Sequence, residues 1–179
     1  MSKTIELHDK SFEPYISESE IEDIVSRLVI EINANYKNET PVLLGILNGS
    51  FMFISDLMKK LDIDVELSFL KLSSYEGTES SGKVNELIGL NSDISGRSVI
   101  VIEDIVDTGK TLQKILEMLP PFQPKQVEVC SLLLKPEVFQ DQFPLHYIGK
   151  EIPNRFVVGY GLDYDELGRN LPEIYQLKG

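Results

Sequence analysis

The sequence has little cysteine, little histidine and few positive charges. Cys130 is the one cysteine in 179 residues, so no disulfide forms within the chain, which fits a reducing compartment. His8 and His146 have no metal-ligand spacing with each other or with Cys130. With 17 Lys and Arg against 29 Asp and Glu, the formal net charge is -12. A general nucleic-acid-binding protein needs a basic surface, so this charge argues against that class.

Long hydrophobic runs are also missing. No apolar stretch approaches the roughly 20 residues that span a bilayer, and residues 1–8 lack the apolar segment of a secretion signal. We therefore expect a cytoplasmic protein that does not bind membranes. The apolar content of 42% and the charged content of 26% are typical of a globular protein. Because no repeat or second domain boundary is visible, residues 1–179 are predicted to form one domain, with a core over about 20–160.

Strand patterns alternate with helical patterns along the chain. This alternation predicts an α/β fold with a mostly parallel, doubly wound sheet and flanking helices. A capping box at Ser17 and Glu20 begins the first helix. Predicted strands span 42–47, 65–72, 99–102, 126–134 and 156–160, predicted helices follow Ser17, Ser50 and Thr111, and 144–153 is a loop or short edge strand. Residues 73–96 are polar and rich in Gly and Ser, which predicts a long flexible loop with a possible hairpin at 84–90.

Residues 98–112 carry the strongest functional signal. The apolar strand 99–102 is followed by Glu103 and Asp104, where we expect it to end, then by a polar turn over 107–111 and a helix. Amide groups at a helix N-terminus suit a phosphate, and two carboxylates beside them suit sugar hydroxyls or a hydrated Mg²⁺. The alternative is that Asp107 or Thr108 only caps the helix and the acids are solvated. That alternative explains one acid better than it explains the whole string.

Two nucleotide-binding motifs are excluded. Gly109-Lys110-Thr111 resembles the end of a Walker A loop, but Asp104 stands where that loop requires its first glycine. Residues 159–161, Gly-Tyr-Gly, begin like a dinucleotide fingerprint, but Tyr164 replaces the third glycine and no helical pattern follows at once. A monophosphate site therefore remains the better interpretation.

The segment 99–111, Val-Ile-Val-Ile-Glu-Asp-Ile-Val-Asp-Thr-Gly-Lys-Thr, resembles the phosphoribosyl pyrophosphate (PRPP) signature of type I phosphoribosyltransferases. Within that family the chain resembles the hypoxanthine-guanine branch. Further matches follow in order at 45–51, 74–75, 134–135, 156–164 and Arg169. The resemblance implies the type I phosphoribosyltransferase fold, with a small hood formed by the N-terminal and C-terminal segments and a mobile loop over about 73–96.

The resemblance implies roles for the residues of the signature. Glu103 and Asp104 would hold the ribose hydroxyls of PRPP and, with Asp163, would serve Mg²⁺. The 5′-phosphate would be bound by Asp107, Thr108, Gly109, Lys110 and Thr111. Asp107 would also act as the general base that takes a proton from N7 of the purine.

Pyrophosphate and purine would be bound by residues outside the signature. Pyrophosphate would meet Leu47, Asn48, Gly49 and Arg169, and in this family the segment 47–49 often contains a strained non-proline cis peptide. Asn48 departs from the family, which usually has lysine there, so Arg169 would matter more. The purine would meet Lys135, Phe156, Val157, Leu162 and Asp163, while Ser74 and Tyr75 would close over the reaction. Taken alone, Lys135 would be an ordinary strand-end charge and Phe156 a core residue.

The expected activity is transfer of a phosphoribosyl group from PRPP to hypoxanthine or guanine, with Mg²⁺, in a homodimer or homotetramer. One alternative is transfer to another base, such as xanthine or a pyrimidine. Another is a regulatory protein that senses PRPP and reads RNA or DNA on the same fold. The charge of -12 and the presence of Asp107 favour the enzyme.

Overall fold

A computed structural model describes residues 3–72, 86–88, 93–139 and 142–179 of the chain. Its larger sheet contains β3 (Val42–Ile46), β4 (Glu66–Leu72), β6 (Ser98–Val106), β7 (Gln126–Leu134) and β8 (Tyr147–Glu151), all parallel, with β5 (Glu86–Ile88) antiparallel at one edge. The order is β5-β4-β3-β6-β7-β8. This arrangement confirms the predicted doubly wound α/β fold.

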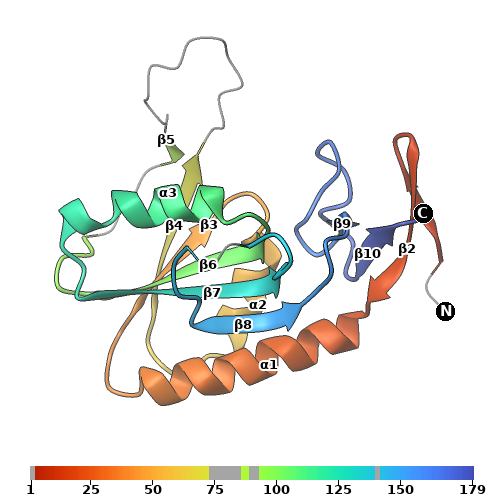
Figure 1. The fold of residues 1–179 in the computed structure, drawn as a ribbon. Helices are drawn as coiled ribbons and strands as arrows, with labels where there is room; N and C mark the ends of the chain where they lie inside the picture. The colour runs from red at the N-terminus through yellow and green to blue at the C-terminus, as the bar shows by residue number, and fades with distance from the viewer. Residues whose placement is uncertain (1–2, 73–85, 89–92, 140–141) are drawn as a thin grey trace, which may run out of the picture.

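Helices cover both faces of this sheet (Figure 1). Helices α1 (Glu18–Asn35) and α2 (Phe51–Lys60) pack on one face, where Ile100 and Ile102 of β6 are buried. Helix α3 (Lys110–Met118) packs on the other face, against Val99 and Val101, and a 3₁₀ turn, η1 (Pro120–Phe122), follows it. Because successive residues of a strand point to opposite faces, covering both faces requires the continuous apolar run that β6 shows.

A smaller antiparallel sheet joins the two ends of the described chain. It contains β1 (Ile5–Leu7), β2 (Lys10–Ile16), β10 (Ile174–Leu177) and β9 (Val157–Val158), in the order β1-β2-β10-β9. Phe12, Val158 and Tyr175 form its core. Figure 1 shows this sheet beyond the ends to which the arrowheads of β6, β7 and β8 point. We call residues 3–16 and 156–177 the hood.

The structure corrects several predicted boundaries. Strand β6 runs on through the acidic pair to Val106, and residues 110–111 already belong to α3. The predicted strand 156–160 is β9 alone, because residues 159–161 all have positive φ, which an extended strand cannot accommodate. Strand β5 pairs with β4, and the rest of the possible hairpin at 84–90 lies outside the described residues. Strand β8 confirms the expected edge strand.

Two further expectations concern the N-terminal capping and the long loop. Ser17 caps α1 as predicted, its hydroxyl accepting a hydrogen bond from the Glu20 amide at 3.3 Å. The predicted loop residues Ser74 and Tyr75 lie outside the described residues. No helix in the described part of the chain is long and apolar enough to cross a membrane.

Candidate active site

The candidate site lies where three neighbouring parallel strands end. After β3 come Leu47, Asn48 and Gly49, with a cis peptide between the first two. Asp107 follows β6, and Lys135 follows β7. Because β3, β6 and β7 are adjacent and parallel, their carboxyl ends meet at one edge of the sheet.

The acidic pair within β6 is held away from water. Glu103 is buried, and its Oε2 atom has no hydrogen-bond partner among the described residues. Burial, and then the charge of Asp104, raise the pKa of Glu103 well above its usual value. Burial also raises the pKa of Asp104 to about 6, although its Oδ1 accepts a hydrogen bond from the Ile105 amide at 2.8 Å. Glu103 therefore lacks the compensation that a cation would supply, whereas the charge of Arg169 partly offsets the burial of Asp104.

Gly49 brings the loop after β3 against this pair. A Cβ atom on Gly49 would lie only 1.6 Å from Oδ2 of Asp104, so the carboxylate occupies the place of a side chain. No larger residue fits without displacing the acid.

The loop after β6 leads into the N-terminus of α3. Asp107, Thr108, Lys110 and Thr111 are exposed, whereas Gly109 is buried with φ of 78°. A Cβ atom on Gly109 would lie 2.9 Å from the ring of Phe139, so this ring supports the loop from behind. Exposed hydroxyls and a helix N-terminus are suited to an anion.

Asp107 and Lys135 form an ion pair across β6 and β7. Nζ of Lys135 lies 3.0 Å from Oδ2 of Asp107, and the lysine side chain is 8% exposed against 49% for the aspartate. The Lys135 amide donates to the Val106 carbonyl at 2.9 Å, which fixes the lysine beside the end of β6. A buried ammonium group needs this carboxylate until another acceptor replaces it.

Arg169 connects the hood to the same region. Its Nη1 donates to the Gly161 carbonyl at 2.9 Å, and its Nη2 lies 2.9 Å from Oδ1 of Asp163. The arginine Nε is buried with no partner within the described residues. Gly161 in turn packs on Gly49, because a Cβ atom there would lie 2.0 Å from the Gly49 carbonyl oxygen. The candidate pyrophosphate residues thus meet through two glycines.

The predicted purine residues are divided between the two parts of the molecule. Phe156 is 44% exposed, and its ring packs against Phe12 and edge-on against Tyr164, with centroids 6.1 and 5.7 Å apart. Val157 and Leu162 are buried in the hood. That Phe156 and Lys135 line one cleft remains a prediction.

Gly161 has a structural role that its sequence context did not predict. It lies in the family-like block 156–164 with no role assigned to it, yet its φ of 99° and its contact with Gly49 both demand glycine. The Gly-Tyr-Gly pattern was the available signal. Tyr164, in the same block, also had no predicted role, and it contacts Phe156.

The described residues contain no group of three or more His, Cys, Asp or Glu that could hold a metal ion. Mg²⁺ does not require such a cage, because one or two carboxylates and substrate oxygens suffice. Glu103 and Asp104, with a free buried oxygen and raised pKa values, fit that arrangement. The carboxylate of Asp163 is shared with Arg169 and the Glu166 amide.

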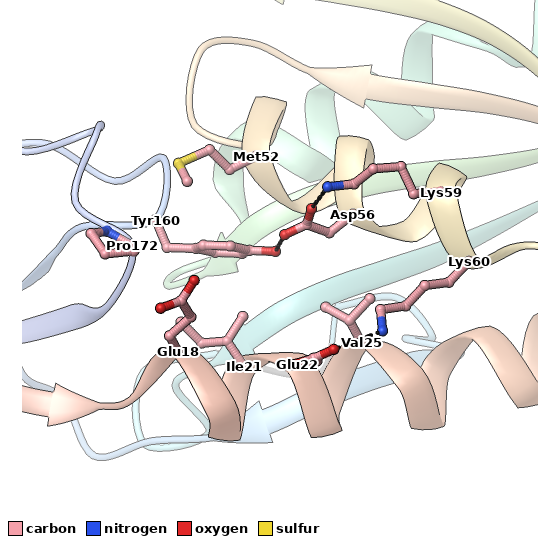
Figure 2. Close-up of a pocket in the computed structure, with 10 residues that line it drawn as sticks. All are labelled: Glu18, Ile21, Glu22, Val25, Met52, Asp56, Lys59, Lys60, Tyr160 and Pro172. Carbon is pink, nitrogen blue, oxygen red and sulfur yellow. Dashed lines mark hydrogen bonds and ion pairs between the residues drawn. The ribbon is translucent and has the colours of Figure 1, made fainter.

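A cavity of about 390 Å³ lies elsewhere, between α1 and α2 (Figure 2). Its lining includes Ile21, Met52, Asp56 and Tyr160 but none of the candidate site residues.

The family model described as "Phosphoribosyl transferase domain" matches residues 16–165. Hypoxanthine-guanine phosphoribosyltransferase of Staphylococcus aureus (strain Mu50) is 42% identical over 173 residues, which cover 96% of this chain and 97% of the relative. The enzyme of the same name from Staphylococcus epidermidis (strain RP62A) is 44% identical over 164 residues, covering 91% and 92%.

Solved structures give the same result. A crystal structure of a hypoxanthine-guanine phosphoribosyltransferase from Bacillus anthracis, with HEPES in the active site, has a TM-score of 0.86 and 38% identity, covering 93% of this chain and 98% of that one. A hypoxanthine phosphoribosyltransferase from S. aureus has a TM-score of 0.86 and 43% identity, covering 93% and 91%.

Proposed function

The chain belongs to the phosphoribosyltransferase family, and on this premise we propose that it transfers the phosphoribosyl group of PRPP to hypoxanthine or guanine. A bond forms between the purine N9 and C1′ of the ribose, the bond from C1′ to pyrophosphate breaks, and the proton from N7 passes to Asp107. The observation that carries this proposal is the Asp107–Lys135 pair at the adjoining ends of β6 and β7.

A 6-oxopurine can give each residue of that pair a new hydrogen-bond partner. Its 6-oxo oxygen would accept a hydrogen bond from Lys135, and its N7–H group would donate to Asp107. The ammonium group then keeps an acceptor and the carboxylate keeps a donor, so breaking the 3.0 Å ion pair leaves neither group unsatisfied. Release from Lys135 makes Asp107 the stronger base, which suits it to accept the proton. A base without this donor and acceptor pattern would leave the buried lysine unpaired.

PRPP would lie along the edge formed by the three strand ends. The loop 107–111 would bind the 5′-phosphate at the N-terminus of α3, and Glu103 and Asp104 would face the ribose hydroxyls. Arg169 and the backbone at 47–49 would bind the departing pyrophosphate, with Asn48 contributing no charge. Mg²⁺, when bound, would neutralise negative charge on the pyrophosphate.

A PRPP-dependent assay with Mg²⁺ against hypoxanthine, guanine, xanthine, adenine and uracil tests the proposal. We expect turnover with hypoxanthine or guanine and release of pyrophosphate. Turnover only with xanthine or uracil would favour another base specificity. Binding of PRPP without turnover of any base would favour a regulatory protein. We further infer that the protein works in the cytoplasm as a homodimer or homotetramer, which light scattering tests for the assembly.

A further inference from the structure

We propose that Tyr160 and Asp56 are positioning residues that hold Arg169 in register with the pyrophosphate loop, residues 47–49. This inference rests on the proposed function. The Tyr160 hydroxyl donates a hydrogen bond of 2.7 Å to Oδ2 of Asp56, which joins the hood to α2. Figure 2 shows the tyrosine ring reaching from the hood past Met52 to the aspartate.

On the hood side, the backbone around Tyr160 is held in an unusual conformation. Tyr160 has φ of 51°, between Gly159 at 100° and Gly161 at 99°. A residue with a side chain rarely adopts such a φ, so other contacts must maintain it. The Tyr160 amide donates to the Leu171 carbonyl at 2.8 Å, and the Gly161 amide donates to the Arg169 carbonyl at 2.9 Å. Tyr160 and Arg169 are therefore parts of one rigid segment.

On the other side, Asp56 belongs to the helix that begins directly after the pyrophosphate loop. Helix α2 starts at Phe51, and Ser50 is tied to the end of β3 by its hydroxyl, which donates to the Ile46 carbonyl at 2.6 Å. The loop and the helix therefore move together. Asp56 is itself fixed, because Nζ of Lys59 lies 2.5 Å from its Oδ1 while Tyr160 binds Oδ2.

The hydrogen bond from Tyr160 to Asp56 fixes the position of the hood more closely than packing alone does. At the loop, the hood touches residues 47–49 through Gly161 and the Gly49 carbonyl, a van der Waals contact that permits sliding. The bond to a charged acceptor specifies both distance and direction. Tyr160 is 3% exposed, so its ring is held by packing while its hydroxyl meets Asp56 in the lining of the cavity. Without this hydrogen bond, Arg169 and the loop would lose their fixed spacing, and the ligand that bridges them would bind less well.

The test uses the full-length enzyme with Tyr160→Phe, which keeps the ring and removes the hydroxyl. We expect the KM for PRPP and the Kd for pyrophosphate to rise about fivefold, while the KM for hypoxanthine changes less than about twofold. Asp56→Asn keeps an oxygen that accepts the hydroxyl hydrogen, so its effect should be smaller. Combining the two substitutions should add little to Tyr160→Phe, since both act on one bond.

Tyr36→Phe is a matched control. Tyr36 is 1% exposed, and its hydroxyl donates to Glu128 at 2.7 Å, in a region that contains none of the candidate site residues. It should lower thermal stability without changing the KM for PRPP. Equal effects of Tyr160→Phe and Tyr36→Phe on PRPP and hypoxanthine would overturn the proposal.

The same measurements separate this inference from the proposed function. If the wild-type protein binds pyrophosphate but transfers to no base, the proposed function fails, and the Kd values still decide the role of Tyr160. If the wild-type protein binds neither PRPP nor pyrophosphate, both proposals fail.

Discussion

At the scale of single residues, the proposed mechanism gives Asp107 two tasks that conflict. In the free protein it neutralises Lys135, which is almost completely buried. As a general base it has to accept a proton, and that is easier once the lysine has turned to the purine. Comparing a substitution of Asp107 with a substitution of Lys135 therefore separates loss of the general base from loss of the ion pair.

Asp107→Asn should lower kcat about 100-fold or more, because the amide cannot take the proton. The Kd for PRPP should change far less. Steady-state kinetics and calorimetric titration measure the two quantities. Lys135→Met is the companion variant, which removes the ion pair but leaves the base, and it should raise the KM for the purine more than it lowers kcat. Unchanged turnover in Asp107→Asn would contradict the general-base role.

Asn48 offers a gain-of-function test at the pyrophosphate side. Asn48→Lys restores the cation usual in the family, and we expect pyrophosphate to bind about fivefold more tightly, the size of a partly exposed ion pair. Product inhibition by pyrophosphate measures the change. Asn48→Met is the control of similar length without charge, and it should show no gain. Equal inhibition constants for both variants would show that the backbone, not the side chain, meets the ligand.

At the scale of elements, β6 is the strand that the sequence predicts most clearly, but its predicted end at residue 102 is wrong. Residues 99–102 are apolar because α1 and α2 cover one face and α3 the other. The strand continues through Glu103 because β7 still pairs with it, Glu103 lying opposite Ser131. A pattern of hydrophobicity does not reveal the polar part of a strand, and here that part contains the residues that we propose to bind a ligand.

Because β6 extends through two buried acids, the free energy of unfolding should depend on pH. The folded-state pKa of Glu103 is raised by burial and that of Asp104 to about 6, so folding favours the protonated forms. In protein treated with EDTA, the contribution of Asp104 is fully present below about pH 4 and is lost as the pH rises through about 6, and that of Glu103 is likewise lost as the pH rises through its raised pKa. The free energy of unfolding, measured with urea, should therefore fall between pH 4.5 and 7 from this source.

Glu103→Gln should reduce that fall and raise the free energy of unfolding at pH 7, because it removes a buried carboxylate that burial disfavours. Glu151→Gln, at an exposed position on β8, is the control and should change neither quantity. Mg²⁺ with PRPP should raise the free energy of unfolding of the wild type at pH 7 more than that of Glu103→Gln. If the two variants have the same pH profile, the burial of Glu103 does not destabilise the free protein.

At the scale of the whole molecule, hydrophobic patterns predicted the larger sheet, whereas the hood was expected only from the family resemblance. Strands β3, β6 and β7 are buried on both faces over most of their length, so each is a mainly apolar segment. Strand β2 contains Pro14 and alternates weakly, and β9 is two residues long. Both exist because β10 pairs with them, a contact across more than 150 residues of sequence for β2. Local patterns carry no information about such a pairing.

The small core of the hood should control the site from a distance. Phe12 is fully buried between Val158 and Tyr175, so Phe12→Ala should destabilise the hood by about 3–5 kcal/mol. Amide hydrogen exchange should quicken in β9 and β10 while β3 and β7 stay protected, and the KM for PRPP should rise with the loss of Arg169 positioning. Uniform acceleration across both sheets would show instead that the hood and the larger sheet unfold as one unit.

The pairing of β2 with β10 also sets an order of events during synthesis. Residues 10–16 are synthesised before the strands of the larger sheet, whereas their partner, residues 174–177, is synthesised after them. The larger sheet can form while β2 still has an open edge, because β8 is complete before residue 152. Gly161, which contacts Gly49 and accepts a hydrogen bond from Arg169, takes its place only when β9 and β10 have been translated. A nascent chain would therefore contain the larger sheet before it could complete the proposed pyrophosphate site.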